Sequence, residues 1–563
     1  MNIFGMKLII LLLFFILCNL YHFNEAKIIT ATPPSTQIRL TCNQTLAPGS
    51  TLALTDKLDL SGRQPDQPKS ITDSCSIVGP SKNEEAATIL VPANDCVLLA
   101  QGEVIISGNI RFVVGHKNRK FDCCDDGEGH GGVLCSYTNL TIKENAVVTI
   151  ETTPPGDDTV IINPGIFWTG KFIQVDGIIK ASLKYPQISG LNGLLSSSGI
   201  YVSTNGKVIG SGMQTIRGAA IQGGDDGTVI NGIVECTNYT AGDAGGCIAA
   251  GKFLNVGPNA IIRARNGKGI SGSSGLVVGV DHAGTFFGTI IAENMNTSDA
   301  GGILSLNSLN MSGNSKIVGR NIIARGGAAA ITTLEFTMND HANVIVNNSW
   351  GGDGGAIECT TLTMLDDSKV SCENSYADSQ GACIASTIIM DDRASIIAKN
   401  MTSKALGGAI AGGYPKQYLI VNGNATIDID GSRSGIYGGA MFFWENISFI
   451  GEAFEVNVRN SAAPCGGGIV TTGVSGVPGE GDVYLDTSDG GELNIENSIE
   501  LNTTKGCLTI EANLWSGTVD KRGSKIAQPC GGGCGGKDRL DNGSCMCKSI
   551  KSGFNECCQH GVI

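Results

Sequence analysis

A repeat of about 26 to 31 residues is the feature of this 563-residue chain that most restricts its fold. In its clearest section, each repeat carries a Met, then Ile or Val six residues later, then Asn ten residues after the Met. The methionines are Met311, Met338, Met364 and Met390. A period of this size is typical of a solenoid, in which each coil buries its apolar face only against neighbouring coils.

Within one repeat, short apolar runs rich in Ile, Val and Leu are separated by Gly, Asn, Asp and Ser. Polar and apolar residues alternate in these runs, which indicates strands, and no stretch after the N-terminus shows a helical period with caps. About three short strands in each repeat predict an all-β fold, the right-handed parallel β-helix, with coils stacked at the spacing of paired strands.

Two rows of recurring polar residues predict the corners of the coil. Residues two positions after each Met, or after Val421 at the same place in the repeat, are types that tolerate left-handed backbone angles: Gly313, Asp340, Asp366, Asp392 and Gly423. Asparagines predict a structural ladder of stacked, inward-facing side chains at another corner: Asn266, Asn294, Asn321, Asn348, Asn374, Asn400 and Asn460. Gly431 interrupts that row, which predicts one coil that turns differently.

The chain divides into four predicted segments. Residues 1–26 have the charge and apolar run of a secretory signal, and the run Leu8 to Leu20 is short for a membrane span. Residues 27–84 lack the repeat and are expected to cap the open first coil. Residues 85–515 are the predicted β-helix. Residues 516–563 carry closely spaced cysteines and are expected to form a small disulfide-stapled module.

Cysteine and asparagine usage predict an exported, glycosylated protein. The chain has 20 Cys, and Cys236 with Cys247, or Cys359, Cys372 and Cys383, lie where disulfides are expected within or between coils. No second apolar run of spanning length follows the signal, so the mature chain is expected in the extracellular space or at the cell surface, without a membrane span. Asn400 is expected to escape glycosylation because it faces inward. The glycosylation candidates are Asn43, Asn139, Asn238, Asn296, Asn310, Asn347, Asn424, Asn446, Asn502 and Asn542.

The balance of acidic and basic side chains limits the classes of partner that are expected. The chain has 39 basic and 52 acidic side chains and few aromatic ones, with no basic stripe, which argues against nucleic-acid and anionic-membrane partners. Glycans or extracellular proteins are the partners that remain, and no cofactor motif is found.

One resemblance adds to this interpretation. Asn348 precedes Gly354-Gly355-Ala356-Ile357, and Asn400 precedes Gly407-Gly408-Ala409-Ile410. This arrangement resembles the repeat of the polymorphic outer-membrane proteins, a family of bacterial autotransporter adhesins with F-x-x-N and G-G-A-I signatures. The resemblance covers residues 260–470. It implies a β-helical passenger and surface adhesion, in a chain whose cysteines and sequons look eukaryotic.

Candidate chemistry is sparse. The segments Gly156-Asp157-Asp158, Gly224-Asp225-Asp226 and Gly129-His130-Gly131 are similar to elements of polygalacturonases. Their order differs and no Arg-x-Lys element completes the set, so no catalytic residue is assigned.

Metal binding is an alternative at two places. Asp125, Asp126, Glu128 and His130 could hold a metal, although the neighbouring paired cysteines favour disulfides that brace an excursion. The corner residues Asp340, Asp366 and Asp392, with Asp367 and Asp391, could bind calcium, although their left-handed backbone explains the row without a ligand.

The leading functional hypothesis is an adhesion, carbohydrate-binding or structural element rather than an enzyme. The alternative is a polysaccharide lyase or glycoside hydrolase of the pectin-lyase-like β-helix class, which would need carboxylates that converge near one sugar bond.

Overall fold

The structure is a computed structural model whose described residues belong to one compact unit, Arg39–Ile563. It describes residues 42–53, 58–60, 74–91, 97–114, 133–152, 166–182, 190–242, 245–269, 277–280, 283–297, 301–412, 417–451, 453–464, 466–471, 482–486, 491–496, 498–500, 514–515, 518–522, 527–528 and 545–546. Within this part of the chain every regular element is a strand. None of these residues forms a helix long and apolar enough to cross a membrane.

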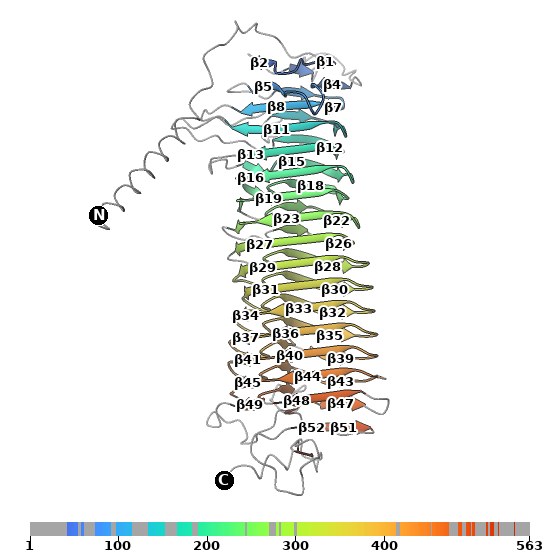
Figure 1. The fold of residues 1–563 in the computed structure, drawn as a ribbon, viewed down its shortest axis with the longest axis vertical. Helices are drawn as coiled ribbons and strands as arrows, with labels where there is room; N and C mark the ends of the chain where they lie inside the picture. Colours follow the sequence, from blue (N-terminus) through green and yellow to red (C-terminus); the bar gives the residue numbers. More distant parts are fainter. Residues whose placement is uncertain are drawn as a thin grey trace, which may run out of the picture. The chain divides into compact units, whose positions relative to one another are not determined.

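Strands from successive repeats stack directly over one another in parallel (Figure 1). Each coil contributes to two sheets, which we call sheet A and sheet B. Sheet A in the central coils contains β28 (Leu304–Met311), β30 (Ile331–Met338), β32 (Ile357–Met364) and β35 (Ile384–Met390). Sheet B there contains β27 (Thr289–Thr297), β29 (Lys316–Ala324), β31 (Asn343–Gly351), β33 (Lys369–Glu373) and β36 (Ser395–Lys399). The predicted all-β parallel β-helix is confirmed.

The interior consists of columns of like side chains. Met311, Met338, Met364 and Met390 pair in register along sheet A, and all four are fully buried. A second column in sheet B carries Ile317, Val344, Val370 and Ile396. Burial of such aliphatic side chains stabilises a fold by about 25 cal/mol per Å² of apolar surface. Each coil can gain this energy only against its neighbours, which is why the repeat is needed.

Left-handed backbone forms the corner between sheets A and B, as predicted. Gly313, Asp340, Asp366, Asp392 and Gly423 have φ values of 64°, 57°, 56°, 55° and 63°. The Asp340 carboxylate accepts a hydrogen bond from the backbone N–H of Gly313 at 2.9 Å, and the Asp366 carboxylate accepts one from Asp340 at 3.0 Å. Asp therefore supplies both the backbone angle and a bond to the preceding coil.

The asparagine corner lies at the far end of sheet B, and there two predictions were wrong. The asparagines have φ values between 52° and 57°, but their side chains are exposed and do not face inward. Gly431 takes the same corner with φ 71°, and its N–H donates to the Arg459 carbonyl at 3.0 Å, as Asn400 does to Asp430. The coil at Gly431 therefore turns like its neighbours.

The asparagine ladder begins one coil earlier than predicted. Asn266 donates from Nδ2 to the Asn238 side-chain carbonyl at 2.9 Å, so Asn238 is also a member. Asn294 donates to Asn266 in the next coil and, further along, Asn400 donates to Asn374, at 3.1 Å each. These amides hydrogen-bond to one another along the surface and take up no space in the core. The amide of Asn460 donates instead to the Asp430 carboxylate at 2.7 Å.

A third corner depends on glycine because the chain there approaches the strand that follows. Gly381 has φ 55°, and a Cβ added to it would lie 2.1 Å from the Ile384 carbonyl oxygen. Gly354 and Gly407 have the same left-handed backbone, with φ 66° and 53°. No L side chain fits this position, which explains the recurring glycine before each Ala-Ile or Cys-Ile pair.

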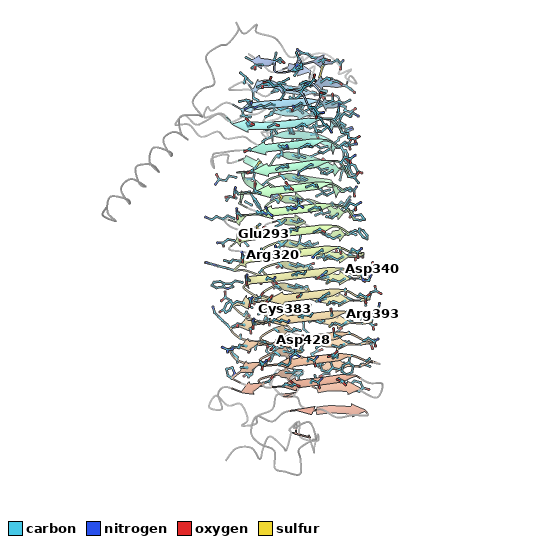
Figure 2. The ribbon with its side chains drawn as sticks, viewed as in Figure 1. Glu293, Arg320, Asp340, Cys383, Arg393 and Asp428 are labelled. Carbon is cyan, nitrogen blue, oxygen red and sulfur yellow. A yellow bond between two sulfur atoms is a disulfide. The ribbon has the colours of Figure 1, made fainter. Side chains whose placement is uncertain are left out.

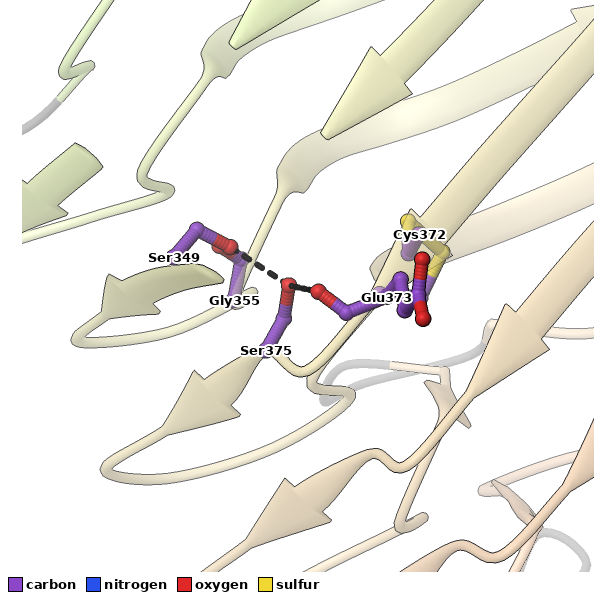
Figure 3. Close-up of a disulfide and its surroundings, with 6 residues drawn as sticks. Ser349, Gly355, Cys372, Glu373 and Ser375 are labelled. Carbon is purple, nitrogen blue, oxygen red and sulfur yellow. Dashed lines mark hydrogen bonds between the residues drawn. A yellow bond between two sulfur atoms is a disulfide. The ribbon is translucent and has the colours of Figure 1, made fainter. Parts of the chain in front are cut away.

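Two disulfides staple the asparagine corner of single coils. Cys236–Cys247 and Cys372–Cys383 each join residues 11 apart, with Cα–Cα distances of 5.8 and 5.6 Å. Beside the second one, Ser349 Oγ lies 2.7 Å from Ser375 Oγ, and Ser375 donates to the Glu373 carbonyl at 3.2 Å (Figure 3). Cys359, the third cysteine of that predicted group, is a buried free thiol.

Parallel pairing also occurs in both flanking segments. In the range predicted as an N-terminal cap, β1 (Gln44–Thr45) pairs with β4 (Cys75–Val78), and a disulfide joins Cys42 to Cys75. In the C-terminal range, β51 (Thr518–Arg522) continues sheet A, whereas β52 (Ala527–Gln528) pairs with β53 (Cys545–Met546) in antiparallel fashion. Three disulfides among the described residues are typical of an oxidising compartment.

Candidate functional site

An aromatic pair stands on the surface just beyond the asparagine corner. Trp350 in β31 is directly opposite Tyr376 in β34 (Tyr376–Ala377), and Tyr376 is opposite Thr402 in β37 (Thr402–Ser403). The two rings meet edge to face, with centroids 5.4 Å apart and an interplanar angle of 82°. Trp350 is 38% exposed although Trp is a residue that proteins usually bury.

Asp378 fixes this aromatic pair. The Trp350 indole Nε1 donates to Asp378 Oδ2 at 2.8 Å, and the Lys404 ammonium forms an ion pair with Asp378 Oδ1. Lys404 Nζ also lies 5.7 Å from the centre of the Tyr376 ring. The hydrogen bond from Lys404, then that from Trp350, and the charges of Lys404 and Arg325 hold the pKa of Asp378 below its ordinary value of 3.8.

This arrangement, which we call the aromatic cluster (Trp350, Tyr376, Asp378 and Lys404), suits a ligand with both apolar and hydroxyl groups. Both carboxylate oxygens of Asp378 are occupied, so its role is to orient the indole. The exposed ring offers an apolar face, while the Lys404 ammonium, which has three N–H donors, stands beside it. Rigid aromatic rings flanked by polar donors bind at low entropic cost, because little freedom remains to be lost.

The repeat in the sequence contained a signal that could have predicted this aromatic pair. Trp350 and Tyr376 each follow a ladder asparagine, Asn348 and Asn374, by two residues, so the repeat places both in one column. Ile323 precedes them in that column, opposite Trp350. Asp378 and Lys404 lie in the variable loops that follow, and their convergence was not predicted.

The predicted metal and catalytic segments lie mostly outside the described residues. Asp125, Asp126, Glu128 and His130 fall in that range, as do Gly156-Asp157-Asp158 and Gly129-His130-Gly131. Asp225 and Asp226 are exposed in β18 (Ile221–Ile230), on the outside of sheet A. The described part of the chain contains no group of three or more His, Cys, Asp or Glu side chains arranged to hold a metal ion.

The acidic side chains of the corner between sheets A and B form hydrogen bonds and ion pairs within the protein. Besides the carboxylate-to-backbone bonds of Asp340 and Asp366, Asp367 accepts hydrogen bonds from Arg393 at 2.5 and 2.9 Å and lies 3.4 Å from His341 Nδ1. The hydrogen bond from Arg393 comes first among the causes that lower the pKa of Asp367. Asp340 and Arg393 lie on the opposite edge of the coil stack from Glu293 and Arg320 (Figure 2).

The glycosylation candidates differ in exposure. Asn139 and Asn347 are partly exposed. Asn502 and Asn542 lie outside the described residues. Asn400, expected to be shielded, is exposed as part of the ladder. The exposed candidates are Asn43, Asn238, Asn296, Asn310, Asn424 and Asn446.

One half-buried acid stands out on sheet A. Glu358, in β32, has its pKa raised to about 7, first by burial and then by the nearby charge of Asp353, while a hydrogen bond from the Ala328 backbone opposes the shift. A carboxyl group that is partly protonated near neutral pH can act as a general acid. Asp353 is the second acidic group at this place.

Comparisons of the chain with protein-family models, with curated proteins and with solved structures find no match.

Proposed function

We propose that this chain is an exported, glycosylated binding protein whose β-helix serves as a rigid support for carbohydrate recognition at the cell surface. The observation that carries the proposal is the aromatic cluster. Its indole is exposed, its ring geometry is fixed by Asp378, and donors from Lys404 stand beside it. Sugars present C–H groups on one face and hydroxyls around the ring, and this cluster complements both.

Export is supported by the N-terminal apolar run and by the disulfides. Neither Cys236–Cys247 nor Cys372–Cys383 would persist in a reducing compartment, and several sequon asparagines are exposed. The resemblance to adhesin repeats supports a role in adhesion. Stacked coils hold their outer columns in fixed register, so a surface site on them needs little reorganisation when a ligand binds.

A glycan array tests the proposal, with the purified chain treated to remove its own N-glycans. The wild type should bind a set of neutral glycans, and the W350A and Y376A variants should lose most of that binding. Phe287→Ala is the matched control, because Phe287 is 41% exposed on another part of the coil. Absence of binding by the wild type, or equal loss in F287A, would overturn the proposal and favour a structural role.

A polysaccharide-degrading enzyme is the second candidate, and the raised pKa of Glu358 favours it. Incubation with a panel of polysaccharides should then release new reducing ends or unsaturated products. The E358Q variant should abolish that release without changing glycan binding at the aromatic cluster. Turnover that survives in E358Q would place the chemistry elsewhere.

A further inference from the structure

A groove with a volume of about 560 Å³ lies on the outer face of sheet B. It runs across β19 (Ile233–Thr237), β23 (Ile261–Arg265), β27 and β29, four consecutive rungs of the β-helix. Arg320 of β29 lines it, and β31, the next strand, carries Trp350 on the other side of the asparagine corner. The groove is therefore a separate surface from the aromatic cluster.

The groove is locally basic although the chain is acidic overall. Its lining carries four cationic side chains, Arg263, Arg265, Lys316 and Arg320, against the two carboxylates of Glu235 and Glu293. Two positive charges are thus in excess, on a chain whose net charge is −13. In a concave surface such an excess raises the local concentration of anions.

The carboxylates hold the arginines in place and leave them accessible. Glu293 lies 3.0 Å from Arg265 Nε and 3.1 Å from Arg320 Nη1, on either side of it. Its side chain is 24% exposed, whereas those of Arg265 and Arg320 are 56% and 57% exposed. Each of these contacts uses one guanidinium nitrogen, and a guanidinium has five N–H donors. The forks are therefore oriented in advance, with donors directed to solvent.

Glu235 repeats this arrangement two rungs away. It lies 2.9 Å from Arg263 Nη1 and 3.5 Å from Lys207 Nζ, and it is 22% exposed. Again one shielded carboxylate is shared by two cations, so this group of three side chains carries a net positive charge. The same geometry at two places along the β-helix indicates a surface that favours a ligand with repeated negative charges.

The spacing and the floor of the groove indicate an extended chain. Arg265, Glu293 and Arg320 occupy one column, so the backbone positions of the two arginines are two rungs or roughly 10 Å apart, and both guanidinium groups contact Glu293 between them. This distance is comparable with two pyranose units of an extended polysaccharide. The floor of the groove at β27 and β29 is Ile291 and Val318, which are adjacent in register and continue the column of Glu235 and Arg263. On β29 this floor is flanked by Lys316 and Arg320. An apolar floor with cationic walls matches a sugar ring whose acidic substituents point sideways.

We propose that this groove is a second binding site and that it takes an anionic oligosaccharide, one that carries carboxylate or sulfate groups, laid along the β-helix axis. Bidentate contacts from guanidinium groups to carboxylate or sulfate oxygens provide the affinity. The inference rests on charge and not on the aromatic cluster, so it does not require that neutral glycans bind.

The experiment measures dissociation constants of the deglycosylated full chain for three probes of equal length: an oligogalacturonate, a sulfated oligosaccharide and a neutral oligosaccharide. The wild type should bind at least one anionic probe at least about tenfold more tightly than the neutral one at low ionic strength, and the difference should shrink with salt. Preference between the two anionic probes identifies the acidic group.

Two variants and a matched control test the assignment. R265Q/R320Q should weaken anionic binding by about tenfold, and K316Q by a smaller factor, because each removes charge from the lining. R459Q removes an arginine from the same column further along, where it pairs with Asp428, and should change nothing. Circular dichroism confirms folding of each variant.

Equal affinity of the wild type for all three probes, or equal weakening in R459Q, would overturn the inference. The W350A variant keeps the two proposals apart. It should still bind the anionic probe and lose binding only to the neutral glycans. Loss of binding at one surface can therefore be detected independently of the other.

Discussion

Asn321 donates a hydrogen bond from Nδ2 to the side-chain carbonyl of Asn294, one coil away, at 2.9 Å. Both residues have left-handed backbone, with φ values of 55° and 57°. One residue type therefore performs two tasks at this corner: it tolerates the angle, and its amide links consecutive coils along the surface.

Substitutions at Asn321 should separate these tasks. Asn321→Gly keeps the backbone angle and loses the amide bonds, which should lower the free energy of unfolding by about 0.5–1.5 kcal/mol. Asn321→Ala also places a Cβ in a left-handed conformation, so it should lose about 1–2 kcal/mol more. Guanidinium unfolding curves measure both. Gly431, which occurs naturally at this corner, explains why Gly is expected to be the milder change. An equal loss in the two variants would contradict the expected order.

Removal of the Cys372–Cys383 disulfide should destabilise the chain without disturbing the packing. The next coil carries Ala398 opposite Cys372, and Ala409 hydrogen-bonded to Cys383, so the C372A/C383A double variant copies a natural coil. Loss of a crosslink over a loop of this length should lower the free energy of unfolding by about 2–3 kcal/mol.

The second staple provides the control for that measurement. C236A/C247A removes a disulfide with the same sequence separation of 11 and should give a similar loss. Under reducing conditions the difference between wild type and either variant should largely disappear. A persistent difference there would show that packing, and not the crosslink, causes the loss.

Stability should depend on pH through Glu358. Its pKa is raised to about 7 from an ordinary 4.5, so burial penalises the ionised form in the folded chain. Below pH 4.5 the carboxyl is protonated in both states and no penalty exists. The penalty grows as the pH rises from 4.5 to 7 and is complete above 7.

Glu358→Gln should therefore stabilise the chain by about 1–3 kcal/mol at pH 8 and leave it unchanged at pH 4. Unfolding midpoints at both pH values measure this. Glu335→Gln, an exposed residue on the neighbouring strand β30, is the control and should have little effect at either pH. Stabilisation of E358Q at pH 4 as well would mean that packing, and not ionisation, is responsible.

Asp378→Ala should weaken glycan binding although Asp378 is not expected to touch the ligand. The indole of Trp350 loses its acceptor and Lys404 loses its counter-ion, so the ring is free to reorient. We expect an affinity loss of about fivefold to tenfold, smaller than in W350A, together with a changed near-ultraviolet dichroism signal from Trp. Asp378→Asn keeps one acceptor oxygen, so its affinity should fall between those of the wild type and D378A. Unchanged affinity in D378A would show that the indole needs no support.

The coil could be predicted from sequence because its corners demand particular residues. Asp366 and Gly381 recur at fixed offsets since few other residues adopt φ near 55°, and Met364 recurs in a fully buried column that admits apolar side chains. The direction of the asparagine row could not be predicted. At Arg320, Asn321 and Ile322 the left-handed corner interrupts strand alternation, so two exposed residues precede a buried one.

The candidate sites were less predictable for a different reason. Register places Trp350 beside Tyr376, but Asp378 and Lys404 reach them from loops whose path the repeat does not specify. In the groove, Arg265 and Arg320 are 55 residues apart in sequence and share a column only because two coils of 28 and 27 residues separate them. Charge counted over the whole chain hides such a local excess.

Because every rung repeats the same columns, tandem duplication of one 26-residue unit would insert a rung without altering any corner. Each insertion would translate all downstream side chains by roughly 4.8 Å along the axis and return them to the same azimuth. The distance between Arg320 and Trp350 along the axis can thus change only in whole rungs, with no change to either surface.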